Sequence, residues 1–240
     1  MRRSIRALAV GIPAHDEVDS IEACLRSVVD AARAVGLPTA VVVAADACRD
    51  GTAERAHSVL ASAPDVRSSV LHTAHRAVGA ARRDSLDAAL RLLDVPAPQI
   101  WLATTDADTV VHQSWLQAHL SWARPGVDGI AGLVQVDWTG HPLDLPARYA
   151  ESIASGGTTL GHGHVHGANL GLLAARWVEV GGCGDAAVAE DEELWRRLRS
   201  VGADVLGVDD LLVTTSGRLT GRAPRGFAHY LTGLATEEVA

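Results

Sequence analysis

The sequence predicts an α/β fold in which a mostly parallel sheet is covered by helices on both faces. In the first 110 residues, short and nearly continuous apolar runs alternate with segments of helical periodicity, the pattern of parallel strands buried on both faces. Acidic residues follow the ends of several of these apolar runs. A chain of 240 residues is long enough to bury a substantial core, so we expect a single domain.

The predicted elements follow from the spacing of the apolar residues. Strands are expected where a short apolar run ends at proline or aspartate, and helices where apolar residues recur every three to four positions. Asp19 and Glu22 have the spacing of a capping box before the first helix, which Gly36 and Pro38 end. In order, the expected elements are strand 5–13, helix 21–35, strand 39–46, helix 50–62, strand 68–74, helix 78–93 and strand 99–108.

The second half of the chain has a looser pattern. Residues 127–138 predict a strand and residues 141–155 a short helix. A loop rich in glycine and histidine follows and leads into another strand near residue 170, and a helix is expected over 191–201. The terminal region is polar and basic before a last short helix.

Composition excludes several classes of protein. A net charge of −8 and a pI near 5.7 argue against a nucleic-acid partner held by counterion release. The three cysteines are far apart and form no CxxC pair, so we expect neither a disulfide framework nor structural zinc, and a cytoplasmic location. No apolar run is long enough to span a membrane, and the N-terminal apolar run is interpreted as a strand. Peripheral membrane contact and a homodimer remain open.

Acidic residues follow the predicted strands at the positions where ligands bind in such sheets. Glu17 lies shortly after the first strand, Asp46 ends the second, and Asp106 and Asp108 end the fourth. Two carboxylates flanking one residue can hold Mg²⁺ or Mn²⁺, and the cation can then neutralise a diphosphate. The alternative for this triplet is a solvated turn.

Six segments of the chain are, in order, VGIPAHDE, VVVAADACRDGT, HRAVGAARRDSL, TTDADT, HGANLGLLAARW with GGC, and AEDEELWRRLRSVGA. Their order and spacing resemble the GT-A glycosyltransferases of family 2, over nearly the full chain. The resemblance implies a Rossmann-like GT-A fold with an antiparallel extension on the acceptor side. It also implies one domain, with a nucleotide-binding half of about 1–113 and an acceptor-side half of about 114–240.

The same resemblance assigns the donor-binding residues. Glu17 and Asp46 would contact the nucleoside, and Arg82, with help from Arg76, would lie near the nucleotide. The structural alternatives stay open at this point. Asp46 could cap the next turn, Arg82 could be a solvated helix residue, and Glu17 could simply precede the helix.

The metal ligands and the catalytic base also come from the resemblance. Asp108 would be the principal ligand of a divalent cation, Mn²⁺ or Mg²⁺, and Asp106 would lie toward the ribose and the metal. Asp191, in the Glu190–Asp191 pair, would take the proton from the acceptor hydroxyl in an inverting transfer. Helix capping is the alternative for these acids, because negative charge at a helix N-terminus is stabilising.

Two further groups of residues have open roles. His162, His164 and His166 alternate and would share one face of an extended segment, which is the basis of a competing zinc-enzyme interpretation. Near the C-terminus, Arg218 stands where we expect a contact to the donor diphosphate, and Arg222 and Arg225 follow it. These arginines could support the leaving group, hold an anionic acceptor, or be solvated.

The predicted function is that of an inverting, metal-assisted glycosyltransferase of the hexosyltransferase type. Its donor would be a nucleoside-diphosphate sugar and its acceptor a small or lipid-linked molecule. The alternatives are a sugar-phosphate nucleotidyltransferase and a catalytically inactive relative that binds carbohydrate or nucleotide. The sequence contains no GxxxxGK[ST], GxGxxG or GxSxG pattern, so ATPases, dinucleotide oxidoreductases and serine hydrolases lack their usual support.

Overall fold

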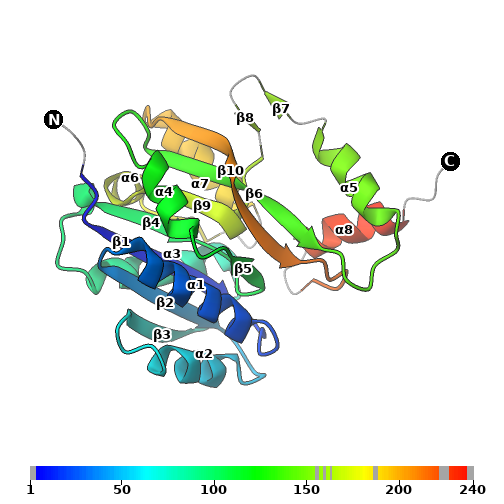
Figure 1. Cartoon of the computed structure of the whole chain (residues 1–240), viewed down its shortest axis with the longest axis horizontal. Helices are drawn as coiled ribbons and strands as arrows, with labels where there is room; N and C mark the ends of the chain where they lie inside the picture. The colour runs from blue at the N-terminus through cyan, green and yellow to red at the C-terminus, as the bar shows by residue number, and fades with distance from the viewer. Residues whose placement is uncertain are drawn as a thin grey trace.

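A computed structural model describes residues 4–154, 157–158, 161–162, 164–185, 189–221 and 227–236. Its centre is an eight-stranded sheet in the order β3-β2-β1-β4-β9-β6-β10-β5 (Figure 1). The elements expected in the first half are confirmed, with ends shifted by a few residues. They are β1 (Ala7–Ala14), α1 (Ile21–Val35), β2 (Thr39–Asp46), α2 (Thr52–Ala61), β3 (Arg67–Thr73), α3 (Val78–Arg91) and β4 (Ile100–Thr104), with a short 3₁₀ turn, η1 (Ala97–Gln99), before β4.

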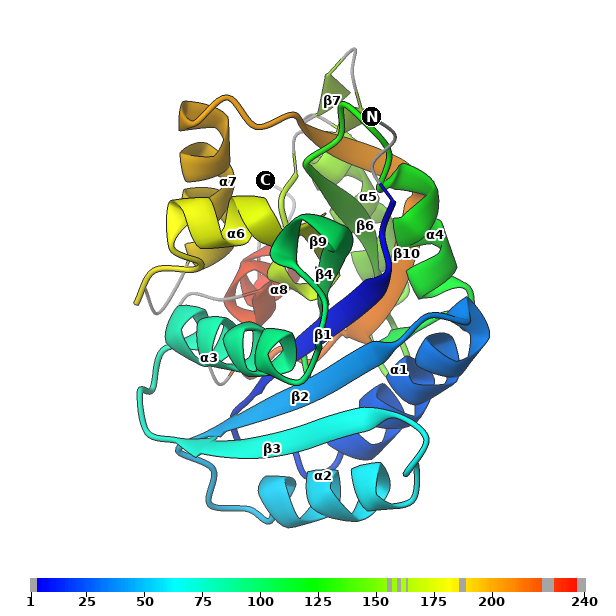
Figure 2. The ribbon, with the colours of Figure 1, turned by 90° about the vertical axis from the view of Figure 1, so that its left-hand side faces the viewer.

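The strands of the first half are parallel, and β1, β2 and β4 are buried on both faces, as their continuous apolar runs predict, whereas the edge strand β3 is mostly only half-buried. Every residue of β1 and β2 is buried, and β1 pairs in parallel with both β2 and β4. Alternate residues of β1 serve two cores: Leu8 and Val10 pack with α1 and α2, whereas Ala7 and Ala9 pack with α3. Figure 2 shows these helices on opposite faces of the sheet.

The second half adds the antiparallel part of the sheet. The strand β9 (Leu170–Leu173), preceded by the 3₁₀ turn η2 (Gly167–Asn169), runs antiparallel between β4 and β6 (Gly129–Asp137). The strand β10 (Val205–Ser216) is parallel to β6, and the short β5 (Thr109–Val111) pairs antiparallel with β10. Three helices cover this half: α4 (Trp115–Trp122), α6 (Ala174–Val180) and α7 (Glu190–Ser200).

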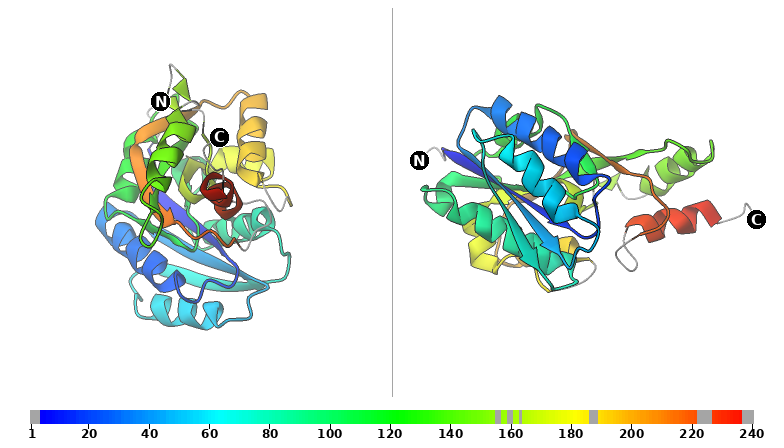
Figure 3. Two further views of the ribbon diagram at one scale, coloured as in Figure 1. Left: turned by 90° about the vertical axis from the view of Figure 1, so that its right-hand side faces the viewer. Right: turned by 90° about the horizontal axis from the view of Figure 1, so that it is seen from below.

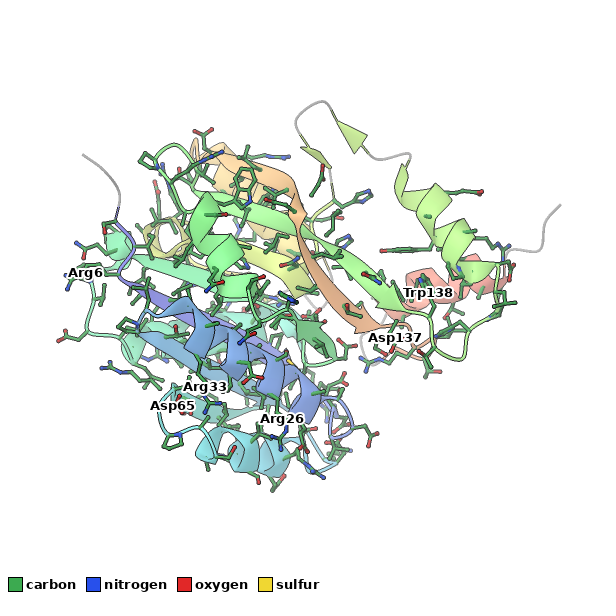
Figure 4. All side chains as sticks on the ribbon, in the orientation of Figure 1. Arg6, Arg26, Arg33, Asp65, Asp137 and Trp138 are labelled. Atoms are coloured by element: carbon green, nitrogen blue, oxygen red, sulfur yellow. The ribbon has the colours of Figure 1, made fainter. Side chains whose placement is uncertain are left out.

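Beyond the sheet, the ends of β6 and β10 lead into a small arm formed by α5 (Leu145–Ala154) and α8 (Phe227–Thr236). Figures 1 and 3 show these two helices side by side, away from the body of the sheet. Asp137 and Trp138 mark the start of the arm (Figure 4), and a small separate core holds it together. A two-stranded ribbon, β7 (Gly157–Thr158) with β8 (Gly161–His162), follows α5. Among the described helices, none combines the length and the apolarity needed to cross a membrane.

The capping box expected before α1 is wrong. Within the described part of the chain, no side chain caps the first turn of this helix. The hydroxyl of Ser20 instead donates to Glu17 Oε2 at 2.8 Å, and Glu22 accepts hydrogen bonds from Arg26 and Arg55. The carboxylate of Glu22 is therefore held by arginines on the helix surface, and it does not turn back to the helix start. The end of α1 at Gly36, in the left-handed conformation, is as expected.

The close approach of α3 to β1 depends on Gly11. A Cβ atom at this position would lie 2.6 Å from both Ser85 Oγ and Leu86 Cγ. We therefore expect Gly11→Ala to lower the free energy of unfolding by about 1–3 kcal/mol, because the added methyl group overpacks the core. Urea unfolding measures the change.

Gly233 in α8 provides the matched control. A Cβ atom there meets nothing within 4 Å, so Gly233→Ala should leave the stability unchanged or raise it through better helix propensity. Equal unfolding midpoints for Gly11→Ala and the wild type would contradict the close packing of α3 on β1.

Candidate active site

A cavity of about 1320 Å³ lies at the carboxyl ends of β1, β2 and β4, where α/β sheets bind their ligands. All eight site residues expected from the sequence line this one cavity. They come from both halves of the chain, so the fold brings together side chains separated by up to 201 positions. These residues are Glu17, Asp46, Arg76, Arg82, Asp106, Asp108, Asp191 and Arg218.

The backbone around the cavity is strained at four places. Among the described residues, the non-glycine residues with positive φ are Asp16, Ala47, Arg76 and Ala189, with φ between 53° and 58°. All four line the cavity. Left-handed backbone at such residues costs about 1–2 kcal/mol each. The surrounding contacts therefore hold the loops around the cavity in fixed conformations.

Asp46 fixes the loop that carries Arg76. Its Oδ1 accepts hydrogen bonds from the amide of His75 at 2.6 Å and from the Thr73 hydroxyl at 3.1 Å. Its Oδ2 accepts from the amide of Ala77 at 3.1 Å. The buried carboxylate thus holds the residues on both sides of Arg76, in the loop between β3 and α3. It does not cap the turn that follows β2.

Arg82 is buried and forms the largest polar network of the site, so the alternative of a solvated helix residue is wrong. Its side chain donates to Thr104 Oγ1 at 2.8 Å and to the carbonyl of Gly167 at 2.9 Å. It also pairs with Asp106 Oδ1 at 2.8 Å and with Glu190 Oε1 at 3.1 Å. Burial alone would lower the pKa of Arg82, but the two carboxylates raise it. This side chain therefore stays charged.

The acidic pair at the start of α7 has two different environments. Both residues line the cavity, but Glu190 is buried against Arg82, whereas Asp191 is partly exposed. Asp191 Oδ2 accepts the Gly167 amide at 2.7 Å, and its Oδ1 accepts the Glu192 amide at 2.9 Å. Burial raises the pKa of both acids, and the charge of Arg82 offsets part of this rise. The carboxylate of Asp191 is thus held in place and made more basic.

Gly167 lets the backbone approach this network. A Cβ atom at residue 167 would collide with the guanidinium of Arg82 and lie 3.2 Å from Glu190 Oε1. The glycine donates its amide to Asp191 and offers its carbonyl to Arg82. The side chain of Asn169, in contrast, is fully buried, and among the described residues it bonds to Trp115 and to backbone carbonyls of β6 and β10. Within this predicted acceptor-side segment, Gly167 therefore contacts residues of the site, whereas the side chain of Asn169 belongs to the buried core.

Arg218 bridges two of the acidic residues and is therefore not a solvated surface arginine. It donates to both oxygens of Glu17, at 2.6 and 2.8 Å, and its Nη2 lies 3.0 Å from Asp108 Oδ2. Arg222 and Arg225 lie outside the described residues.

Asp108 lies in an electrostatically crowded position. Burial raises its pKa to about 6; the charge of Arg218 opposes this rise, whereas Asp106 and Glu17 add to it. Asp106, two residues after the end of β4, has an Oδ2 atom that accepts no hydrogen bond among the described residues. Carboxylate oxygens are the ligands that Mg²⁺ and Mn²⁺ prefer, so the pair fits a hard divalent cation.

Among the described residues, the pair has no third protein ligand. In the described part of the chain, no group of three or more histidine, cysteine, aspartate or glutamate residues could hold a metal ion. The rings of His164 and His166 stack with their centroids 5.8 Å apart, so these two histidines share one face, as the alternation predicts. The side chain of His162 lies outside the described residues.

Several residues of the site were not predicted from the sequence. Thr104 looks like one more buried strand residue, yet it accepts a hydrogen bond from Arg82. Thr215 donates to Asp108 from β10, a strand that the apolar pattern does not predict. Arg196 and Arg199, inside the expected helix 191–201, also line the cavity. Their positions three residues apart on one helix face were the available signal.

Comparison with known proteins agrees with this architecture. The model of the family described as glycosyl transferase family 2 matches residues 9–144. No curated protein sequence matches the chain. The mannosyltransferase PcManGT from Pyrobaculum calidifontis, in complex with GDP-Man and Mn²⁺, has a TM-score of 0.67 and 18% identity, over 97% of this chain and 69% of its own.

Two other solved structures are similar. S. aureus TarS 1-349 in complex with UDP-GlcNAc has a TM-score of 0.60 and 14% identity, over 90% of this chain and 60% of its own. Glucosyl-3-phosphoglycerate synthase from Mycobacterium tuberculosis, in complex with Mn²⁺, UDP-Glc and phosphoglyceric acid, has a TM-score of 0.52 and 15% identity, over 96% of this chain and 76% of its own.

At such low sequence identities, the structural similarity shows the fold alone. This is the GT-A fold expected from the sequence. The chain spans 60% of TarS 1-349 and 36% of a longer TarS structure. The family match covers more than half of the chain and includes the strand ends that carry Glu17, Asp46 and the Asp106–Asp108 pair. The chain therefore belongs to glycosyl transferase family 2.

Proposed function

We propose that this protein is an inverting glycosyltransferase that moves a sugar from a nucleoside-diphosphate sugar to an acceptor hydroxyl, with Asp191 as the general base. One observation carries the proposal: the carboxylate of Asp191, fixed by the Gly167 amide, lines the same cavity as Asp106 and Asp108. A base and a site for a diphosphate thus share one cavity. The family match argues against the nucleotidyltransferase alternative.

The donor end of the cavity consists of the loops after β1, β2 and β3. The similar structures were solved with GDP-Man, UDP-GlcNAc or UDP-Glc, which supports a nucleoside-diphosphate sugar as the donor. Asp46 accepts three hydrogen bonds from described residues, and an ionised carboxylate can accept about four. We assign its remaining acceptor position, and Glu17 nearby, to the nucleoside. Arg76, held by the same loop, and Arg82 complete the nucleotide end.

The diphosphate end is assigned to Asp106, Asp108 and Arg218. The two aspartates would hold Mn²⁺ or Mg²⁺, which supplies positive charge to the leaving diphosphate when it is bound. Arg218 already contacts Asp108, so its guanidinium can also donate to phosphate oxygens at this position.

At the acceptor end, Asp191 removes the proton of the acceptor hydroxyl as that oxygen attacks the anomeric carbon. The bond from the anomeric carbon to the diphosphate oxygen breaks on the opposite side, and the nucleoside diphosphate leaves with the electron pair. The sugar configuration is therefore inverted. A base works best when its pKa approaches the working pH, and burial moves the pKa of Asp191 in that direction.

Nucleotide binding is the first test. We expect UDP, GDP or dTDP to raise the melting temperature in the presence of Mn²⁺, because a ligand that binds only the folded state stabilises it. Removing Mn²⁺ with EDTA should reduce the effect, and Asp108→Asn should remove its metal-dependent part. If none of the three nucleotides changes the melting temperature, the proposed function is wrong.

The base assignment is tested by Asp191→Asn. The amide cannot accept the hydroxyl proton, so we expect the turnover number to fall by about 10²-fold or more, while the nucleotide-dependent thermal shift stays as in the wild type. Full transfer by the variant would contradict the assignment. Nucleotide binding without transfer in the wild type would favour the inactive relative.

The acid limb of the pH profile is an independent control on the same residue. Asp191 acts only as the carboxylate, and burial raises its pKa. Transfer should therefore be lost, as the pH falls, at a higher pH than an ordinary aspartate would give. An acid limb within or below the usual aspartate range would assign the base to another group.

Arg82→Met tests whether this arginine holds the site together. The change leaves Glu190 buried without its cation, and breaking a buried pair in this way costs about 3–5 kcal/mol. Urea unfolding measures the loss. Arg26→Met is the matched control, because Arg26 is 64% exposed and pairs with Glu22 on the surface of α1; it should hardly change the stability. Equal stability of the two variants would refute the role of Arg82.

A further inference from the structure

Four arginines line the cavity with guanidinium groups that have no hydrogen bond or ion pair among the described residues: Arg49, Arg76, Arg196 and Arg199. Their neighbour Arg197 behaves differently. It donates to the carbonyls of Val180 and Gly182, at 2.7 and 2.6 Å. The cavity wall therefore carries four guanidinium groups that no carboxylate of the described residues pairs with, although acidic side chains also line the cavity.

The four arginines form two groups. Arg49 and Arg76 belong to the loops after β2 and β3, at the donor end. Arg196 and Arg199 belong to α7, the helix that begins with Glu190 and Asp191. Figure 2 shows α7 and the β2–β3 edge on opposite sides of α3. The arginines of α7 thus lie on the side of the cavity that holds the proposed base.

Helix geometry sets the distance from Asp191. A rise of 1.5 Å per residue places Arg196 about 7.5 Å and Arg199 about 12 Å farther along the axis of α7. Positions 196 and 199 are three apart and share one face of the helix. Both side chains are exposed, so the two guanidinium groups can meet one ligand in the cavity.

The acidic residues near this pair are nearly all engaged elsewhere. Glu190 pairs with Arg82, and Asp191 accepts two backbone amides. Glu192 is exposed, and it forms no ion pair with Arg196 in the described part of the chain. Two like charges on one helix face repel each other. An anion from outside the protein relieves that repulsion, and guanidinium groups match phosphate and carboxylate geometry.

We propose that the acceptor is an anionic molecule whose phosphate or carboxylate binds Arg196 and Arg199 while its hydroxyl reaches Asp191. This inference rests on the proposed function and adds the chemical class of the acceptor. The anionic group and the reacting hydroxyl would lie several bonds apart, as the spacing along α7 requires. The group can belong to a free small molecule or to a lipid headgroup.

The test measures anion binding directly, by calorimetric titration of the full chain. The probes are inorganic phosphate, glycerol 1-phosphate and glycerate, with glycerol as the uncharged control. We expect at least one anion to bind the wild type and glycerol not to bind. The double variant Arg196→Gln/Arg199→Gln should bind that anion at least about tenfold more weakly, because it loses two charge-assisted contacts.

Arg91→Gln is the matched control. Arg91 is exposed, has no partner among the described residues and does not line the cavity, so its variant should bind the anion like the wild type. Sedimentation with phosphatidylcholine vesicles, with and without phosphatidic acid, separates the two sources. Binding only to the acidic vesicles, lost in the double variant, indicates a lipid-linked anion; binding of the free anions indicates a soluble acceptor.

Two results would overturn the proposal: no binding of any anion or acidic vesicle to the wild type, or equal binding by the double variant. Thermal shifts with UDP, GDP and dTDP are measured in parallel, so that failure of the anion site can be distinguished from failure of the proposed donor site. If the nucleotides fail while the anion still requires Arg196 and Arg199, the proposed function falls and the anion site stands.

Discussion

The buried guanidinium of Arg82 is the interaction on which the site depends. Removing this charge from water costs several kcal/mol, and four oxygen partners compensate the cost. They belong to Thr104, Asp106, Gly167 and Glu190, and hence to β4, the turn after it, the segment before β9 and the start of α7. Because a half-satisfied buried network is unstable, these four segments are fixed together. Within the sheet that already joins β4 to β9, Arg82 thus ties the donor and acceptor sides of the site together.

The sequence could predict much of the fold because its signals there are local. Apolar runs that end at acidic residues place Asp46 and Asp106 at strand ends, and the structure confirms those strands. The strand β10 escaped prediction because its pairing register shifts between Gly207 and Leu212, where two aspartates interrupt the apolar pattern. The network of Arg82 escaped it because its partners lie up to 108 positions away. No periodicity encodes such contacts.

The electrostatics of the diphosphate end favour a divalent cation. The negative charges of Asp106 and Glu17 lie close enough to Asp108 to raise its pKa. The guanidinium of Arg218 bridges Glu17 and Asp108. Burial raises the pKa of Asp108 to about 6, and the excess of carboxylates over cations at this position adds to the rise. A divalent cation would relieve this repulsion and also attract a diphosphate. The same arrangement would repel an anionic donor without the metal.

The acceptor side is where this chain has its own character. The family match ends at residue 144, so α7 and the arm of α5 and α8 lie beyond it. We propose that the nucleotide-binding half ends near residue 113 and that the rest serves the acceptor. In this proposal the strand ends bind the donor, and the acceptor, whose shape and charge differ from one enzyme of a fold to another, meets α7. The unpartnered charge on α7 therefore bears on the proposed acceptor, because it lies on the same helix as the proposed base.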